Sequence, residues 1–354
     1  MPTWGELLQE LKILQESAAE RPEEFGGQSP FDVLRRKYLR ALSKKTGRAT
    51  IIYATAWMEN KEGLSAEALT INLGDIHGFM EAVSNVEERQ VDLFLHSPGG
   101  SAEAAESIVE YLRTRFDHIR VVVPVAAMSA ATMVALGADE IVMGAHSQLG
   151  PIDPQFTIFT PEGPRSAPAQ AIKDQFEMAK AECQDPTNIA AWLPIVRSYA
   201  PGLLAQCDHQ RALAEELVHR WLGKYMFKDV DDPEEKARAA AAWFADFTAF
   251  RSHGRRVSRD DARAQGLNVT GLEEDGELQD AMLSVHHAIR HTLAGTGATK
   301  IVENHHGRAY VEMVNQVAVI PASAQPQQPP LRAVPPQAPA AMPNRNRQRK
   351  KRRR

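Results

Sequence analysis

The chain has little cysteine and no long apolar run, and each shortage excludes a class of protein. Its 354 residues include two cysteines, Cys183 and Cys207, too few for a disulfide framework and typical of reduced thiols in a reducing compartment. No apolar run reaches the roughly 18 residues that a membrane-spanning helix needs. The first residues, MPTWGELLQELKILQE, are amphipathic and partly acidic, unlike a signal peptide. We therefore expect a cytoplasmic protein, peripheral at a membrane if its basic end binds one.

Acidic residues are missing from the C-terminal end. The last 35 residues, 320–354, hold eight prolines, nine Lys or Arg and no Asp or Glu. This composition buries too little apolar surface to fold, so it predicts a disordered tail. Removing the nine tail cations from the formal total of -4 leaves -13 for residues 1–319. The basic end, residues 343–354, is expected to make weak, salt-sensitive contacts with nucleic acid or an anionic membrane.

The rest of the chain alternates β-rich and helical segments. Residues 1–48 predict an N-terminal helical arm of two helices separated by RPEEFGGQSP. Expected strands and helices then follow in turn: strands 49–57, 90–97, 119–126 and 140–144, and helices 102–115 and 129–138. The segment INLGDIHGFMEAV between the first two strands indicates a further helix, with Asp75 as its N-cap. This alternation indicates an α/β fold with a mostly parallel sheet covered by helices.

The pattern changes in the second half of the chain. From about residue 165 to 250 apolar residues recur at helical spacing, which predicts a helical excursion that covers the site or builds subunit contacts. Shorter elements return after residue 253, including a helix over 277–293. We therefore expect one core domain, residues 49–319, between the arm and the tail.

The stretch LFLHSPGGSAEAAE joins a buried strand to a helix through Ser-Pro-Gly-Gly. Gly99 and Gly100 lack a Cβ, so the backbone N–H groups of this loop can face a cavity and bind an oxyanion. A tight strand-to-helix turn or a phosphate cradle would use the same residues. The loop alone does not decide between these uses.

The stretch VVVPVAAMSAAT delivers Ser129 to the start of the next helix. A nucleophile gains from the positive end of a helix dipole, although serine at this position also acts as an N-cap. Both loops follow neighbouring parallel strands, whose carboxyl ends are where α/β sheets bind ligands. The Gly-Gly loop and the N–H of Ala130 could therefore converge on one oxygen.

These residues resemble a known family. LHSPGGS, followed about thirty residues on by AMSAATMVALGADEIVMGAHSQLGPIDPQ, resembles the serine dehydrogenase proteinase (SDH) family, a branch of the Clp protease and signal peptide peptidase A fold that is related to crotonases. The resemblance runs from Phe31 to Val314 and includes DIHGFM, FRSHGRRVSRDDARAQGL and KIVENHHGRA. It implies a Clp/crotonase-like fold, a serine endopeptidase and a homo-oligomer. It also implies Ser129 as nucleophile and Gly99, Gly100 and Ala130 as oxyanion hole.

The resemblance leaves two ways to deprotonate the serine. A Clp-like triad needs a histidine about two dozen residues after it, where this chain reads SQLGPIDPQ, and His146 comes too early. The signal peptide peptidase branch implies a Ser-Lys dyad, and Lys173 lies at a comparable separation, with Lys180 a second candidate. A lysine must be desolvated to act as a base near neutral pH. We predict Lys173, whose neighbours Ile172 and Phe176 are apolar.

Residues 147–156, SQLGPIDPQF, are expected to form a loop or extended edge. In the related fold this region lines the peptide groove, which implies Leu149, Gly150 and Asp153 as groove residues. A protein or peptide substrate could add to this edge as a strand. Asp153 could instead orient a catalytic group or cap the turn before Pro154.

Several histidines invite a metal interpretation: His286, His287, His291, His305 and His306. Because no acidic ligand accompanies them in a recognisable pattern, we favour exposed helix histidines and expect neither a metal nor another cofactor. Two alternatives to the peptidase remain. One is a Clp-fold scaffold without turnover, tethered by its basic tail. The other is a crotonase-type acyl-CoA enzyme, for which the sequence offers no suitably placed glutamate.

Overall fold

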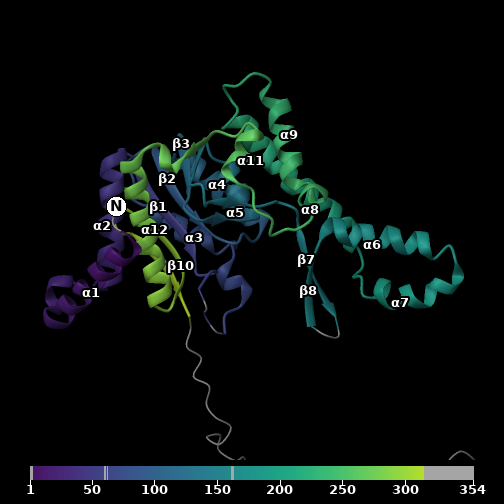
Figure 1. Ribbon diagram of the computed structural model, residues 1–354, viewed down its shortest axis with the longest axis horizontal. Coiled ribbons are helices and arrows are strands. Elements are labelled where there is room, and N and C mark those ends of the chain that lie inside the picture. The colour runs from purple at the N-terminus through teal and green to yellow at the C-terminus, as the bar shows by residue number, and fades with distance from the viewer. Residues whose placement is uncertain (1–2, 60, 62, 161–162, 315–354) are drawn as a thin grey trace, which may run out of the picture. The chain divides into compact units, whose positions relative to one another are not determined.

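A seven-stranded, mostly parallel sheet forms the centre of the protein (Figure 1). The computed structural model describes residues 3–59, 61, 63–160 and 163–314, so the predicted tail lies outside the described residues. The strand order is β11-β10-β1-β2-β3-β5-β9. The parallel strands are β1 (Ala49–Thr55), β2 (Gln90–His96), β3 (His118–Val123), β5 (Glu140–Met143) and β9 (Val269–Gly271). β10 (Ala298–Asn304) and β11 (Ala309–Met313) form an antiparallel edge. The α/β expectation is confirmed.

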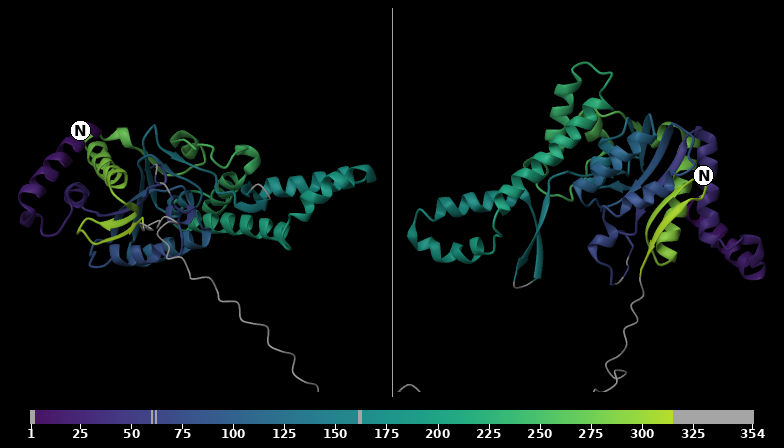
Figure 2. Two further views of the ribbon diagram at one scale, coloured as in Figure 1. Left: turned by 90° about the horizontal axis from the view of Figure 1, so that it is seen from below. Right: turned by 180° about the vertical axis from the view of Figure 1, so that it is seen from behind.

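Helices cover both faces of this sheet, which explains why its strands are apolar on both sides. Along β1, Ile51 and Tyr53 pack into one core, and Ile52 and Ala54 into the other. The first core includes residues from α3 (Asp75–Ala82), α4 (Ala102–Arg115) and α5 (Ala130–Leu136). The second includes residues from α2 (Pro30–Thr46) and α12 (Gly276–Gly295). Figure 2 shows this layering from two further sides.

The N-terminal arm forms the two predicted helices, α1 (Trp4–Glu20) and α2. Each begins at a capping box, in which the N-cap side chain and an acidic residue three positions later satisfy each other's backbone N–H groups. A short 3-10 helix, η1 (Pro22–Phe25), lies between them. Leu7 and Leu11 of α1 pack with Leu34 of α2 and Ala288 of α12. Burial of these side chains fastens the arm to the sheet domain.

The region predicted to be helical from residue 165 begins differently. Residues 155–168 form a β-hairpin of β7 (Gln155–Thr160) and β8 (Gly163–Pro168), so the helices start only at Ala169. They are α6 (Ala169–Glu182), η3 (Pro186–Asn188), α7 (Ile189–Arg197), α8 (Leu203–Lys224), α9 (Pro233–Ala245) and α10 (Phe247–Phe250). Trp221 of α8 and Phe244 of α9 are buried in the first core. In contrast, β7, β8, α6 and α7 project from the side of the sheet (Figures 1 and 2).

Short elements complete the described part of the chain: β4 (Ala126–Ala127), β6 (Gln148–Leu149), η2 (Ala66–Leu69), α11 (Arg259–Ala264) and, before α12, η4 (Leu272–Glu274). β4 and β6 pair in parallel outside the main sheet.

Asp75 is not the predicted N-cap. It lies inside α3, fully buried, and accepts hydrogen bonds from Lys300 and from the hydroxyl of Tyr53. Among the described residues, no helix is both long and apolar enough to cross a bilayer.

Candidate active site

The Gly-Gly loop and the Ser129 turn touch each other, as their sequence positions predict. Gly99 has φ +103°, and a Cβ on it would lie 2.6 Å from both the Met128 carbonyl oxygen and Ser129 Cβ. Gly100 has φ +153°, and a Cβ there would lie 2.2 Å from the carbonyl oxygen of Ile71. Only glycine permits this backbone path and this approach. Gly99 therefore allows the contact between the two loops, and Gly100 allows the close approach of Ile71.

Ser129 occupies the N-cap position of α5 but does not cap it. Its backbone has φ +52° and ψ -122°, and its side chain makes no cap hydrogen bond. A positive φ at a residue other than glycine is strained, and such strain is concentrated at functional sites. The half-buried side chain lines a cavity of about 620 Å³. The hydroxyl is therefore presented to a cavity, which an N-cap role would not require.

Two backbone N–H groups at this cavity are available to a ligand. Within the described part of the chain, those of Gly100 and Ala130 have no hydrogen-bond acceptor, and both residues line the cavity. The N–H of Gly99 donates instead to Ser97 Oγ at 3.2 Å. Two unpaired donors beside a serine hydroxyl form the kind of site that binds a developing oxyanion. Gly99 serves the close contact between the loops, while Gly100 and Ala130 supply the donors.

A histidine that the sequence motifs did not single out also lines this cavity. His253 lies in the loop between α10 and α11, and its Nδ1 is 2.8 Å from Oδ1 of Asp153. Asp153 is 3% exposed, and its Oδ2 accepts a hydrogen bond from Gln155 Nε2 at 2.9 Å. A carboxylate accepts the Nδ1 hydrogen, so in the neutral imidazole Nε2 carries the lone pair. His253 and Ser129 line the same cavity without a hydrogen bond between them.

Backbone hydrogen bonds hold together the segments that carry Asp153 and His253. Leu149 and Val257 exchange backbone hydrogen bonds of 3.0 and 2.9 Å, and the Ile152 N–H donates to the Phe244 carbonyl at 2.9 Å. These bonds fix the segment before Asp153 to residues on both sides of His253. Asp153 thus contacts His253 across the fold and is not a local turn cap.

The predicted groove residues need correction. Leu149, Gly150 and Asp153 are buried and do not line the cavity. Both backbone groups of Leu149 are bonded to Val257, and the Gly150 N–H donates to Thr132 Oγ1 at 2.9 Å, so neither residue offers a free edge to a peptide. The cavity is lined instead by residues that follow Gly150, including Ile152 and Phe156.

The two lysines proposed as the base lie elsewhere. Lys173 forms an ion pair with Asp208 of α8, and its side chain is 35% exposed. Lys180 pairs with Glu177 at 2.7 Å and is 58% exposed. Neither lines the cavity that holds Ser129. An ion pair stabilises the charged ammonium, whereas a base must be neutral, so this geometry does not support the predicted Ser-Lys dyad.

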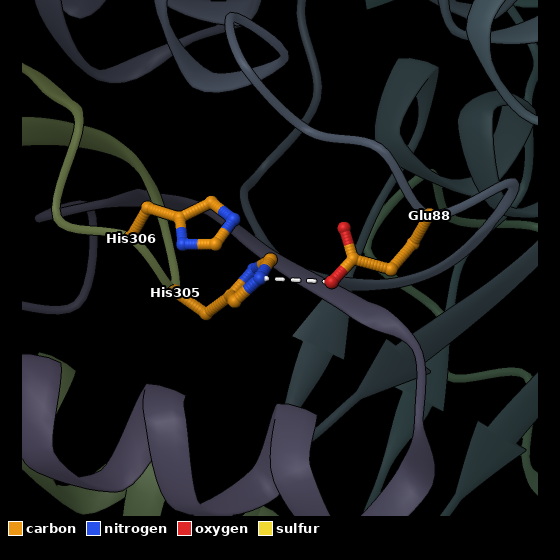
Figure 3. A group of neighbouring side chains, drawn as sticks. All are labelled: Glu88, His305 and His306. Atoms are coloured by element: carbon orange, nitrogen blue, oxygen red, sulfur yellow. Dashed lines mark ion pairs between the residues drawn. The ribbon is translucent and has the colours of Figure 1, made fainter.

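The histidines considered for a metal are not simply exposed. His286 and His291 are each 5% exposed, which corrects the expectation of exposed helix histidines. Glu88, His305 and His306 lie close enough for their ligand atoms to share an ion (Figure 3). However, His305 Nδ1 accepts the Thr50 N–H at 3.2 Å, so in the neutral ring Nε2 carries the hydrogen and faces Glu88 at 3.3 Å. This arrangement is an ion pair or hydrogen bond in which Nε2 has no lone pair for a metal.

The sequence prediction did not include His253, because the Clp order places the histidine soon after the serine. The order along this chain is serine, aspartate, histidine, and His253 comes 100 residues after Asp153. Triads of the same geometry occur in several chain orders. The segment FRSHGRRVSRDDARAQGL, which carries His253, already belonged to the resemblance. This segment contains a single histidine, so the order serine, aspartate, histidine indicates His253 from the sequence.

Two curated relatives share part of this chain's sequence. MJ0137 and MJ1495 of Methanocaldococcus jannaschii, both described as uncharacterized, are 33% and 42% identical over 126 and 69 residues. These segments are 34% and 20% of this chain, and they span only 43% and 24% of the relatives' lengths.

Two mutant structures of the 1510-N membrane-bound stomatin-specific protease, one with a substrate peptide, are 16% identical to the chain, with TM-scores of 0.34 and 0.35. They cover 60% and 56% of this chain and 79% and 70% of their own. Residues 32–191 match the model of the ClpP-like SDH-type serine proteinases. This match confirms the resemblance of the two loop motifs to the SDH-type serine proteinase family.

Proposed function

We propose that the protein is a serine endopeptidase in which Ser129, His253 and Asp153 act as a Ser-His-Asp triad. The observation that supports this proposal is that His253, whose Nδ1 is held by the buried Asp153, lines the same cavity as Ser129. The family match supports the coarser assignment to serine proteinases.

The proposed reaction follows from these positions. His253 Nε2 accepts the proton of Ser129 as Oγ attacks the carbonyl carbon of a peptide bond. The N–H groups of Gly100 and Ala130 stabilise the resulting oxyanion. The C–N bond breaks, His253 gives the proton to the leaving amine, and Oγ remains acylated. Water then attacks the ester with His253 as base, which releases the acid and restores Ser129.

Asp153 has a positioning role in this scheme. Its carboxylate keeps the hydrogen on Nδ1, so that the Nε2 lone pair is free for the serine proton, and it stabilises the imidazolium that forms. The triad replaces the dyad with Lys173, whose ammonium is held by Asp208. A hydrogen bond between the serine and the base is not required before substrate binds, because such bonds tighten in the Michaelis complex.

The cavity lining favours a peptide with an apolar side chain near the cleaved bond. Met133, Ile152 and Phe156 supply apolar surface, and the carboxylate of Glu103 lies at the exposed rim. A crotonase-type reaction would need a carboxylate where this chain presents Ser129. A scaffold without turnover would not need strained backbone at a hydroxyl.

Hydrolysis of unfolded casein by the full-length chain tests this function. Ser129→Ala removes the nucleophile and is expected to abolish hydrolysis. Ser107→Ala, which alters an exposed serine of α4, is the matched control and should keep wild-type activity. Equal activity of the wild type and Ser129→Ala would refute the proposed nucleophile.

A further inference from the structure

Helix α7 is an apolar helix that this chain leaves uncovered. Its sequence, IAAWLPIVR, has Arg197 as its one polar residue, yet none of its residues is buried. Ile189, Leu193 and Ile195 are 46%, 42% and 37% exposed. A helix that is apolar all round is normally enclosed by protein or lipid. In the described part of the chain, no other segment encloses α7.

The position of α7 makes this surface accessible. The helix lies in the extension that projects from the sheet domain (Figure 1), and the same projection is seen in Figure 2. Its contacts run back to α6, where Trp192 Nε1 donates to Glu182 Oε2 at 2.8 Å. Just beyond α7, the Tyr199 hydroxyl donates to Gln175 at 2.8 Å. These bonds hold α7 on α6 while Ile189 and Leu193 stay exposed.

The charge pattern indicates what covers this surface. Residues 186–207 contain a single charged residue, Arg197, and no acidic one. The C-terminal residues 345–354 contain eight Lys or Arg and no acidic residue. A nucleic acid would attract the basic end but offers nothing to an apolar helix with one cation. An anionic bilayer suits both, because its acyl region accepts apolar side chains and its headgroups attract cations.

We propose that α7 inserts its apolar side chains into the headgroup and acyl boundary of an anionic phospholipid bilayer. A helix of nine residues is only about 14 Å long, so it lies within the interface and does not span the membrane. Trp192 and Tyr199 are of the residue types that favour this interface. A single weak insertion gives reversible binding, and the basic end supplies the second attraction that stable anchoring needs. This inference is independent of the proposed peptidase function.

Sedimentation of the full-length chain with vesicles tests the proposal. The wild type should bind phosphatidylcholine vesicles that contain phosphatidylglycerol and bind pure phosphatidylcholine vesicles more weakly. The double variant Ile189→Ser/Leu193→Ser removes two apolar side chains and should weaken binding about tenfold. Ile13→Ser is the matched control, since Ile13 of α1 is 62% exposed, and it should bind as the wild type does.

Three results would overturn the proposal. These are no binding of the wild type to phosphatidylglycerol vesicles at low salt, equal binding of the double variant and the wild type, or equal losses in the double variant and in Ile13→Ser. A double variant that binds vesicles normally but sediments with a lower molar mass would show that a second copy of the chain covers α7. Because both substituted positions are exposed, thermal unfolding of the double variant should match that of the wild type. This comparison shows whether the double variant is folded.

Discussion

Nδ1 of His253 lies 2.8 Å from Oδ1 of Asp153, and His253 lines the cavity that Ser129 also lines. The aspartate is buried and the histidine is partly exposed. A buried carboxylate needs a partner to offset its desolvation. The same bond that satisfies Asp153 therefore also fixes the orientation of the imidazole.

The identity of the base can be tested by paired substitutions. His253→Ala removes the proposed base and should lower kcat by about 10³-fold or more. Lys173→Ala should change kcat by less than about threefold, because Lys173 is held in a solvent-accessible ion pair. Steady-state hydrolysis of a peptide substrate measures both. A large loss with Lys173→Ala and a small one with His253→Ala would restore the dyad.

Asp153→Asn tests the positioning role. Asparagine keeps the shape but can donate a hydrogen to Nδ1, which would place the imidazole hydrogen on Nε2 and block proton acceptance. We expect kcat to fall by about 10²–10⁴-fold while KM changes little. Since Asp153 is buried, the thermal unfolding of this variant must be recorded beside the kinetics. A rise in KM alone would instead indicate a role in binding substrate.

Gly99→Ala tests the contact between the two loops. The added Cβ would meet the Met128 carbonyl oxygen and Ser129 Cβ at 2.6 Å and force alanine into φ +103°, which should cost about 2–4 kcal/mol of unfolding free energy and most of the activity. Gly47→Ala is the matched control. Gly47 also has positive φ, but nothing lies within 4 Å of the point that an added methyl group would occupy, so only about 1 kcal/mol is expected. Urea unfolding compares the two variants, and equal losses would show that loop contact is unimportant.

The stability of the fold should fall in mild acid because of buried histidine. Burial, aided by the charge of Arg290, lowers the pKa of His96 to about 4, from an ordinary value of 6.5. The unfolded chain therefore binds a proton at His96 between pH 6.5 and 4 that the folded chain does not bind. Unfolding is favoured as the pH falls through this window, by up to about 1.4 kcal/mol per pH unit for this group.

His96→Leu removes this proton uptake, so its unfolding free energy should depend less steeply on pH than that of the wild type. His209→Gln, at an exposed histidine of α8, is the control and should keep the wild-type slope. Urea unfolding at several pH values between about 7 and 4.5 measures the difference. Parallel curves for the wild type and His96→Leu would contradict the assignment.

Much of the fold could be predicted because its signals are local. Apolar runs such as 119–126 indicate strands buried on both faces, and helical periodicity located α4 and α12 closely. The hairpin of β7 and β8 was missed because β8, GPRSAP, is exposed or half-buried along its length and carries no apolar alternation. The buried pair of Lys300 and Asp75 was missed because it joins residues 225 positions apart. Nothing near either residue in the sequence shows the other.

The candidate site divides in the same way. Ser129, Gly100 and Ala130 lie in strand-to-helix turns, and a local sequence pattern is enough to predict such turns. Lys173 was chosen for its apolar neighbours, and Ile172 is indeed buried, but the next position on a helix faces a different direction and meets Asp208. The base depends on tertiary contacts, which no local pattern contains.

The most direct test of the account is the rate at which a fluorophosphonate probe labels the full-length chain, followed by intact mass and peptide mapping. The account predicts one adduct, on Ser129, formed rapidly in the wild type and in Lys173→Ala and at least about a hundredfold more slowly in His253→Ala. Rapid labelling of His253→Ala at Ser129, or an adduct on another residue that persists in Ser129→Ala, would contradict it.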